Sequence, residues 1–215
     1  IEYFKKFFLN LNVSVNQIFC SSYAKSINYK DNFSSTENLS FIDIGFNKTS
    51  MNCYIKNEII FLGTLPIGGN HITKDISSIL KVDLNEAENL KLSFDTDQKT
   101  LNEKKISPDL IQQIIFARTE ELLELSAKSI KLSLGLGELE QCKMILMGEG
   151  SKILDNKFKE KISFSNDIDL LEETTDNICR SGFKLGEGLN KQEVIVIPKK
   201  QIKQGFFEKL FHFFK

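Results

Sequence analysis

The chain has 215 residues, of which 41% are hydrophobic and 27% charged, and this composition supports one large hydrophobic core or two small ones. The 28 Lys and Arg residues nearly balance the 29 Asp and Glu residues, so the charge gives no reason to expect nucleic-acid binding. No apolar run approaches the roughly 18–20 residues of a spanning helix, and we do not expect an integral membrane protein. The 4 cysteines lack metal-site spacing, and we expect core thiols in a reducing compartment.

The first part of the chain predicts short elements around a polar loop. Ile1–Leu9 places its aromatic side chains on one helical face, and we expect this helix to face a core rather than a membrane surface. Gln17–Cys20 is a candidate strand, and Ser22–Ile27 is a candidate helix. The polar stretch Asp31–Asn38 is typical of a loop. These elements lead into the first long strand.

A strand, a tight loop and a second strand are predicted over Phe41–Ile55. The apolar run Phe41–Ile44 carries one acid, Asp43, and breaks at Gly45, and Met51–Ile55 is the second strand candidate. The loop between them contains the hydrogen-bonding residues Asn47, Lys48 and Thr49. Such a loop can hold a phosphate with its backbone amides and Mg²⁺ with its carboxylate. A plain hairpin turn gives the same local pattern.

Two more glycine-containing turns each follow an apolar strand candidate. Ile59–Leu65 leads into Gly68 and Gly69 before an amphipathic helix over His71–Lys81, whose N-terminal amides could face a phosphate. Met144–Met147 is a fully apolar strand candidate. It ends in the turn residues Gly148, Gly150 and Ser151. Three turns of this kind suit a nucleotide cleft, although a simple loop-to-helix junction also uses glycine.

Further helices are predicted between and after these turns. A short helix carries Glu88 and Lys91 at i,i+3 spacing, which suits either cleft residues or a surface ion pair. Ser107 is a good N-cap for a long helix that reaches about Leu134. We expect another helix over Asn177–Leu185.

The C-terminal part combines a strand candidate, Glu193–Pro198, with a polar linker at 199–204 and an amphipathic segment at 205–215. Apolar and polar residues of that segment separate onto opposite arcs of a helix. The predicted membrane-binding set is Phe206, Phe207, Lys209, Leu210, Phe211, Phe213, Phe214 and Lys215. We expect reversible binding to an anionic membrane surface. The alternative is a helix docked on the protein's own core.

Several motifs together resemble the FtsA family of cell division proteins, which are actin-like ATPases. They are DIG (43–45), LPIGGNHITKDI (65–76), AENLK (87–91), FARTEELLEL (116–125), LMGEGS (146–151) and the Phe-rich basic tail. The resemblance implies an α/β, actin-like (ribonuclease H-like) fold with an inserted smaller α+β subdomain and a C-terminal amphipathic helix. The implied divisions are 1–36 (end of a first subdomain and connection), 37–70 with 142–198 (split second subdomain), 71–141 (insertion), 199–204 (linker) and 205–215 (helix).

The same resemblance implies a function. The residues named in the three turns would bind ATP with Mg²⁺, Asp43 being the metal-facing acid and Glu88 and Lys91 facing the ribose and adenine. Arg118 and Glu121 match family positions that face the C-terminal peptide of the tubulin-like division protein FtsZ. The whole protein would form actin-like filaments and tether FtsZ to the cytoplasmic face of the bacterial inner membrane at the division site.

Other functions are compatible with the same cleft. An actin-like pilus-assembly protein and a sugar-kinase-type phosphotransferase are the alternatives. No Ser–His–Asp, Cys–His or metal-ligand constellation is visible in the sequence. We therefore assign no catalytic residue, and expect at most a weak ATPase with a mainly structural role.

Overall fold

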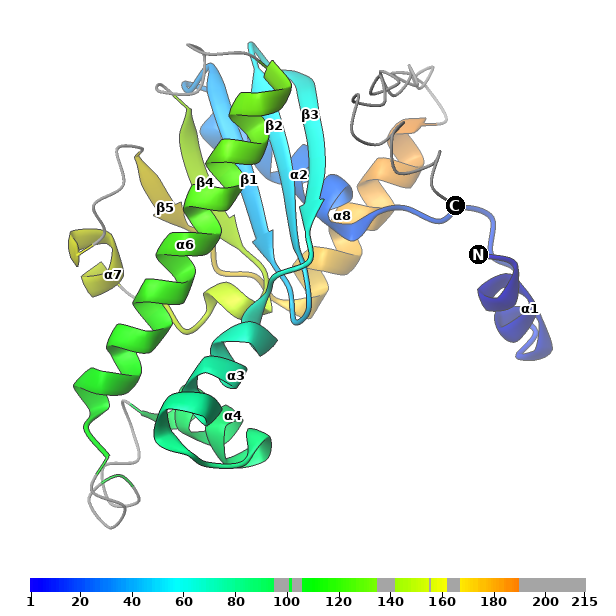
Figure 1. The fold of residues 1–215 in the computed structure, drawn as a ribbon. Coiled ribbons are helices and arrows are strands. Elements are labelled where there is room, and N and C mark those ends of the chain that lie inside the picture. The colour runs from blue at the N-terminus through cyan, green and yellow to red at the C-terminus, as the bar shows by residue number, and fades with distance from the viewer. Residues whose placement is uncertain (95–100, 102–105, 135–141, 155, 162–166, 190–215) are drawn as a thin grey trace, which may run out of the picture.

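A five-stranded mixed sheet with helices on both faces forms the centre of the protein (Figure 1). The computed structural model describes residues 1–94, 101, 106–134, 142–154, 156–161 and 167–189. The strand order is β3-β2-β1-β4-β5, so β1 is the central strand. The strands are β1 (Asn38–Ile44), β2 (Thr49–Ile55), β3 (Glu58–Leu65), β4 (Lys143–Met147) and β5 (Ile168–Leu170).

The central strand β1 joins an antiparallel half of the sheet to a parallel half. β2 and β3 follow it as an antiparallel meander, with Ile44 opposite Thr49 across the first loop. β4 runs parallel to β1, and β5 parallel to β4. Phe41 and Ile42 are both 0% exposed, as expected for a strand that is covered on both faces. The loops that leave β1 and β4 therefore emerge at the same edge of the sheet.

Helices on the two faces give the protein three layers (Figure 1). The long helix α6 (Pro108–Leu134) crosses one face, and α3 (Gly69–Leu80) and α4 (Leu84–Ser93) lie beside it at the edge where β3 ends. On the other face, α2 (Ser21–Lys30) packs against α8 (Thr175–Leu189). The remaining elements are α1 (Glu2–Asn10), the 3-10 helices η1 (Asp31–Phe33) and η3 (Glu149–Ser151), and α7 (Asn156–Lys161). Within the described ranges, none of the helices is long and apolar enough to cross a membrane.

Each face of the sheet has its own hydrophobic cluster, because side chains alternate between the faces along every strand. Leu39 and Phe41 belong to the cluster on the α2 side, whereas Ile42 and Ile44 belong to the cluster under α3, α4 and α6. The larger cluster adds, among others, Met51, Ile72, Ile76, Ala87, Leu90, Ile111, Ile115, Leu122, Met144 and Leu146. The smaller cluster adds Tyr29, Tyr54, Ile145 and Met147. The sheet is thus held between two apolar layers.

Most of the predicted elements around the site are confirmed. The strands expected at 41–44, 51–55, 59–65 and 144–147 all form, as do the helices expected at 22–27, 71–81, 107–134 and 177–185. Four of the described elements were not predicted: β5, α7 and the 3-10 helices η1 and η3. The candidate strand Gln17–Cys20 is wrong, because this segment pairs with no neighbouring strand.

The expectation for Ile1–Leu9 is half right. A helix forms there as α1, but none of its residues is buried, so the core-facing prediction is wrong. Its periodicity gives a helical face without supplying a partner for that face. The core-thiol expectation holds for Cys53 and Cys142, which are buried, and fails for Cys20 and Cys179, which are exposed.

The predicted division of the chain into subdomains stays a prediction. The helices α4 and α6 and all but the first two residues of α3 lie in the range 71–141 of the predicted insertion, and the three helices contribute to one core cluster with β1 and β2. The predicted strand at 193–198, the linker at 199–204 and the amphipathic segment at 205–215 lie outside the described residues.

Candidate functional site

The three glycine-containing turns predicted from the sequence meet at the carboxyl ends of β1 and β4. The Gly69 N–H donates to the Gly45 carbonyl oxygen at 2.9 Å, which joins the start of α3 to the loop after β1. A Cβ atom on Gly150 would lie 2.6 Å from Ile44 Cγ2 and 3.3 Å from the Gly45 carbonyl oxygen. A Cβ atom on Gly69 would lie 3.7 Å from Gly150 Cα. The backbones approach one another closely, and the approach requires glycine at position 150, whereas a Cβ atom at position 69 would make an ordinary van der Waals contact.

The Gly148 backbone adopts a conformation that favours glycine. Its φ angle is 93°, in a region that residues with a side chain rarely adopt. A Cβ atom at this position would also collide with the Asp43 carboxylate and the Ile44 carbonyl. The turn after β4 therefore holds its backbone against the acid at the end of β1.

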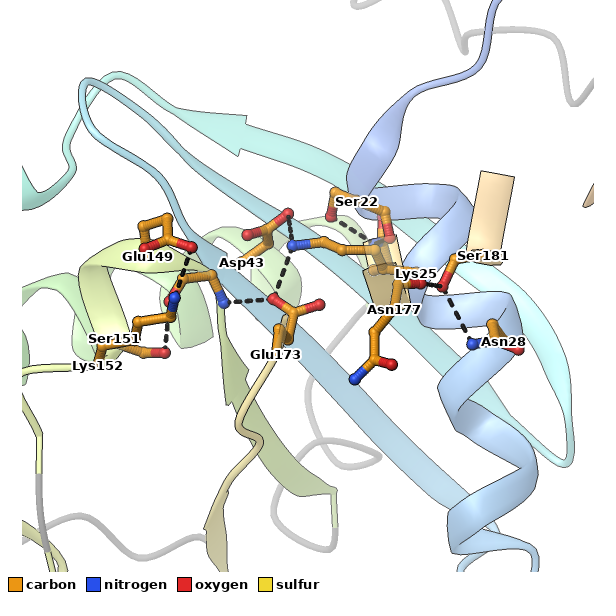
Figure 2. Close-up of polar contacts among 12 residues, drawn as sticks. Ser22, Lys25, Asn28, Asp43, Glu149, Ser151, Lys152, Glu173, Asn177 and Ser181 are labelled. Carbon is orange, nitrogen blue, oxygen red and sulfur yellow. Dashed lines mark hydrogen bonds and ion pairs between the residues drawn. The ribbon is translucent and has the colours of Figure 1, made fainter. Parts of the chain in front are cut away.

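A buried polar centre lies beside these turns (Figure 2). Lys25 of α2 places its Nζ 2.9 Å from Asp43 Oδ2 and 2.9 Å from Glu173 Oε2. The Gly148 N–H donates to the same Glu173 oxygen at 2.8 Å. The side chains of Lys25, Asp43 and Glu173 are 5%, 12% and 2% exposed. These three residues, called the buried centre below, join α2, β1 and the segment after β5 through one desolvated ammonium group.

Sequence reasoning identified the acid of the buried centre but missed its two partners. Helical spacing in α2 places Lys25 on one face with Ser22, Ser26 and Tyr29, and the structure shows that this face is buried. A lysine on the inner face of a helix indicates a buried partner. Glu173 follows a three-residue strand, β5, which the sequence did not predict. No local pattern in the sequence distinguishes this buried acid from the exposed acids of the chain.

The buried centre does not fit the Mg²⁺ ion that the sequence prediction placed on Asp43. Mg²⁺ takes oxygen ligands in near-octahedral geometry. Asp43 Oδ2 and Glu173 Oε2, the oxygens that converge here, already contact an ammonium group. In the part of the chain that the structure describes, no group of three or more His, Cys, Asp or Glu side chains could hold a metal ion. The cation next to Asp43 is Lys25.

The predicted pair Glu88 and Lys91 forms a polar cluster with the start of α3. Lys91 Nζ donates to Glu88 Oε2 at 2.7 Å, to Thr73 Oγ1 at 2.9 Å and to the Gly69 carbonyl at 3.3 Å. Burial would raise the pKa of the Glu88 carboxyl, but hydrogen bonds from Lys91 and Thr73 outweigh it and lower that pKa. Since Lys91 is 5% exposed, the pair is part of the built site and not an ion pair on an open surface.

The first amides of α3 are already hydrogen-bonded, which corrects the expectation that they face a phosphate. The Gly69 N–H is used by the loop after β1, as described above, and the Asn70 N–H donates to the Phe46 carbonyl at 2.8 Å. The Gly68 N–H donates to His71 Nδ1 at 3.2 Å, so this histidine caps the helix. The start of α3 is thus fastened to the loop and does not present these amides to a ligand.

The polar residues predicted to contact a nucleotide differ in exposure. The hydroxyl groups of Thr49 and Ser151 donate to backbone carbonyls within the protein, at 2.7 Å and 2.8 Å. A nucleotide contact through either hydroxyl proton would require that bond to break. Asn47 and Lys48 are exposed at the tip of the loop after β1, and Asn47 Oδ1 accepts a hydrogen bond from an asparagine of α3. The loop tip is therefore the accessible part of this turn.

Arg118 and Glu121 lie along a groove between α3 and α6. Arg118 binds Asp75 of α3 in a bidentate manner, with Nε 2.5 Å from Oδ2 and Nη2 2.8 Å from Oδ1, and its Nη1 donates to Glu121 Oε2 at 2.6 Å. These three residues, called the groove triad below, join α6 to α3. The groove has a volume of about 440 Å³ and an apolar lining of Ile79, Leu110, Ile114 and Ala117. Arg118 is thus already paired within the protein, whereas the apolar lining is open.

Comparison with known sequences identifies the family. The family model described as "Cell division protein FtsA" matches residues 40–195, more than half of the chain. The Cell division protein FtsA of Helicobacter pylori (strain ATCC 700392 / 26695) is 29% identical over 94 residues, which cover 44% of this chain and 19% of that protein. That of Porphyromonas gingivalis is 30% identical over 127 residues, covering 53% of this chain and 26% of that protein. The chain therefore spans about a fifth to a quarter of the length of these relatives.

Comparison with solved structures identifies the fold. MreB5 of Spiroplasma citri, solved bound to ADP, superposes with a TM-score of 0.64 and 14% identity, covering 88% of this chain and 65% of that one. The ethanolamine utilization protein EutJ from Carboxydothermus hydrogenoformans superposes with a TM-score of 0.51 and 16% identity, covering 71% of this chain and 49% of that one. The predicted actin-like α/β fold is confirmed. With this fold and a family match over residues 40–195, the chain belongs to the FtsA family of cell division proteins.

Proposed function

We propose that this chain is part of an actin-like cell division protein that binds ATP at the edge of the sheet where its three turns meet. The observation that carries the proposal is the mutual approach of the Gly45, Gly69 and Gly150 backbones at the carboxyl ends of β1 and β4. Open α/β sheets bind their ligands at this edge. The relatives named as cell division proteins support the cellular role, and the ADP bound to MreB5 supports a nucleotide as ligand.

The loop after β1 is the part of the site that meets the phosphates. Lys48 and Asn47 are exposed at its tip, and a cation together with a polar turn attracts a triphosphate. Lys91 contacts both the Gly69 carbonyl and Glu88, and we propose that the nucleoside binds next to this pair. The first amides of α3 hold the two turns together instead of binding the ligand.

Titration with a fluorescent ATP analogue tests this site. We expect Lys48→Ala to weaken binding by about 5–10-fold, the effect of losing one exposed charge-assisted contact. The matched control is Lys128→Ala, because Lys128 is also exposed but lies on α6, outside the three turns. Equal affinities for the two variants would place the phosphates elsewhere.

We further propose that the groove between α3 and α6 binds the C-terminal peptide of FtsZ. The proposal rests on the resemblance at Arg118 and Glu121 and on the open apolar lining that includes Ile79 and Leu110. Since the groove triad joins one guanidinium to two carboxylates, its charge does not by itself attract an acidic peptide. Apolar side chains of the peptide supply the affinity, and Arg118 fixes its orientation.

Calorimetry with an acidic FtsZ peptide separates this groove from the rest of the surface. Ile79 is 54% exposed in the groove, and Ile79→Glu should weaken binding by about tenfold or more, because it adds a like charge to an apolar contact. Leu132→Glu is the control, since Leu132 is 79% exposed on α6 and does not line the groove. If both variants bind as the wild type does, the peptide site lies elsewhere.

We propose the segment 205–215 as the membrane anchor, which would place the protein on the cytoplasmic face of the bacterial inner membrane at the division site. Its support is the separation of Phe and Leu from charged residues around a helix. Replacing Phe207 and Phe211 together with Glu should abolish co-sedimentation with anionic liposomes. Replacing the exposed Leu132 and Phe183 with Glu should leave co-sedimentation intact. Filament formation, the remaining family property, should require the full-length protein.

A further inference from the structure

The cation beside Asp43 is part of the protein itself. Lys25 Nζ lies 2.9 Å from Asp43 Oδ2 and 2.9 Å from Glu173 Oε2, and Figure 2 shows its side chain extending from α2 between the two carboxylates. Glu173 Oε2 also accepts the Gly148 N–H at 2.8 Å. A metal ion bound between the two carboxylates would compete with the ammonium group for Asp43 Oδ2 and Glu173 Oε2. The fold thus places an ammonium group between the two carboxylates.

The surroundings hold this arrangement in place. Lys25 is 4% exposed, so its ammonium group can leave the two carboxylates only by entering an apolar layer or by opening α2 from the sheet. Glu173 Oε1, the oxygen that does not contact Lys25, is itself buried. A hydrated metal ion has no exposed carboxylate of this pair to bind, apart from the slight exposure of Asp43.

Two other carboxylates near the three turns also contact a lysine, one in a partly buried pair with Lys91 and one in an exposed pair with Lys152. Glu149 Oε1 lies 2.7 Å from Lys152 Nζ, and Glu88 Oε2 lies 2.7 Å from Lys91 Nζ. With the buried centre, four acids near this edge contact a lysine, namely Asp43, Glu88, Glu149 and Glu173. A divalent cation at any of these acids would lie beside an ammonium group, and like charges repel.

We propose that Lys25 is a built-in cation that excludes a divalent metal from Asp43, so that a nucleotide binds at this edge without a metal ion on that acid. The first half of the proposal stands on the buried centre alone. The second half rests on the proposed nucleotide site.

A Mn²⁺ titration of the full chain without nucleotide, followed by electron paramagnetic resonance, tests the first half. The wild type should show no Mn²⁺ site that depends on Asp43. Lys25→Ala removes the ammonium group and leaves two facing carboxylates, so it should bind Mn²⁺ at least about tenfold more tightly than the wild type. Adding Asp43→Asn to Lys25→Ala should abolish that gain.

Two results would overturn the exclusion of metal by Lys25. One is a Mn²⁺ site in the wild type that Asp43→Asn removes, a measurement that does not depend on the folding of any Lys25 variant. The other is a folded Lys25→Ala, by circular dichroism, that binds Mn²⁺ no better than the wild type. Either result would mean that the ammonium group is not what keeps metal away.

A second titration uses the fluorescent ATP analogue in Mg²⁺ and in EDTA. The wild-type affinity should change by less than about threefold between the two buffers. A loss of about tenfold or more in EDTA that disappears in Asp43→Asn would overturn the proposal. Absence of binding in both buffers would instead refute the nucleotide site, and the Mn²⁺ measurement would still decide the role of Lys25.

Discussion

The buried centre and the groove triad each join one basic side chain to two carboxylates, but they differ in their access to water. The side chains of the buried centre are 2–12% exposed, whereas those of the groove triad are 26–52% exposed. In the buried centre, water cannot replace a lost partner, so each charge requires the others. In the groove triad, water and salt compete with every contact.

The geometry of the contacts alone does not tell which of these two clusters contributes more to stability. The groove triad has the better geometry, because Arg118 binds Asp75 through two parallel hydrogen bonds. The buried centre has single contacts from a lysine. Burial nevertheless makes the buried centre the more important of the two for stability, because removing one member of a buried group leaves uncompensated charge in a medium of low dielectric constant. The buried centre should therefore be the cluster on which the folded state depends.

The largest expected effect is the loss of stability in Lys25→Met. This substitution keeps the unbranched shape of the side chain, shortens it by one atom and removes the charge, which leaves Asp43 and Glu173 facing each other without a cation. We expect the free energy of unfolding in urea to fall by about 3–5 kcal/mol. The protein should still fold at low urea, because small domains have about 5–15 kcal/mol of stability.

Arg118→Met is the matched variant in the groove triad, since it also replaces a cation that contacts two carboxylates. We expect it to lower the free energy of unfolding by only about 0–1 kcal/mol, because its partners can be solvated. The comparison would fail if Arg118→Met were as destabilising as Lys25→Met. It would also fail if both variants had the stability of the wild type.

A smaller effect is expected at alkaline pH from Tyr29, which lies in the smaller core cluster beside the buried centre. Burial, followed by the nearby charge of Glu173, raises the pKa of Tyr29 to about 12. The unfolded chain loses the phenol proton near its ordinary pKa of 10.0, while the folded protein still holds it. Stability is therefore fully present below about pH 10 and is lost as the pH rises to about 12, by about 2 kcal/mol.

Denaturation curves between about pH 8 and 11 for Tyr29→Phe check this effect, because the variant has no phenol to titrate. The wild type should lose more stability over this range than Tyr29→Phe does. Tyr3→Phe is the control, since Tyr3 is 77% exposed on α1, and it should follow the wild type. Parallel curves for Tyr29→Phe and the wild type would contradict the raised pKa.

The elements that bring these clusters together could largely be predicted from the sequence. Apolar runs that end in glycine turns gave β1, β3 and β4, and amphipathic periodicity gave α3 and α6, because these signals are local. The convergence of the three turns also follows once β1 and β4 are taken as parallel strands of one sheet.

The contacts within the two clusters could not be predicted in the same way. Lys25 and Glu173 are separated by 148 residues, and nothing near either residue in the sequence indicates the other. Arg118 was predicted as a partner-binding residue, but its bond to Asp75 depends on how α6 lies against α3. The hydrogen bonds from the first amides of α3 depend likewise on where the loop after β1 contacts the start of that helix. Sequence patterns identify elements, whereas the pairing of charges depends on packing between them.

The smallest expected effect is the salt dependence of the groove triad. It tests most directly whether access to water and ions distinguishes the two clusters. Raising the salt concentration from about 0.1 M to about 1 M shortens the screening length from about 10 Å to about 3 Å. The stability difference between wild type and Arg118→Met, up to about 1 kcal/mol at low salt, should shrink by about half or more. The difference for Lys25→Met should stay nearly constant, because ions do not enter the buried centre.

Urea denaturation of the three proteins at both salt concentrations gives these two differences. General effects of salt on the hydrophobic core cancel, because each variant is compared with the wild type in the same buffer. A difference for Arg118→Met that survives high salt would mean that the bidentate contact with Asp75 behaves as a buried pair despite its exposure. The geometry of that contact, and not its access to water, would then decide its contribution to stability.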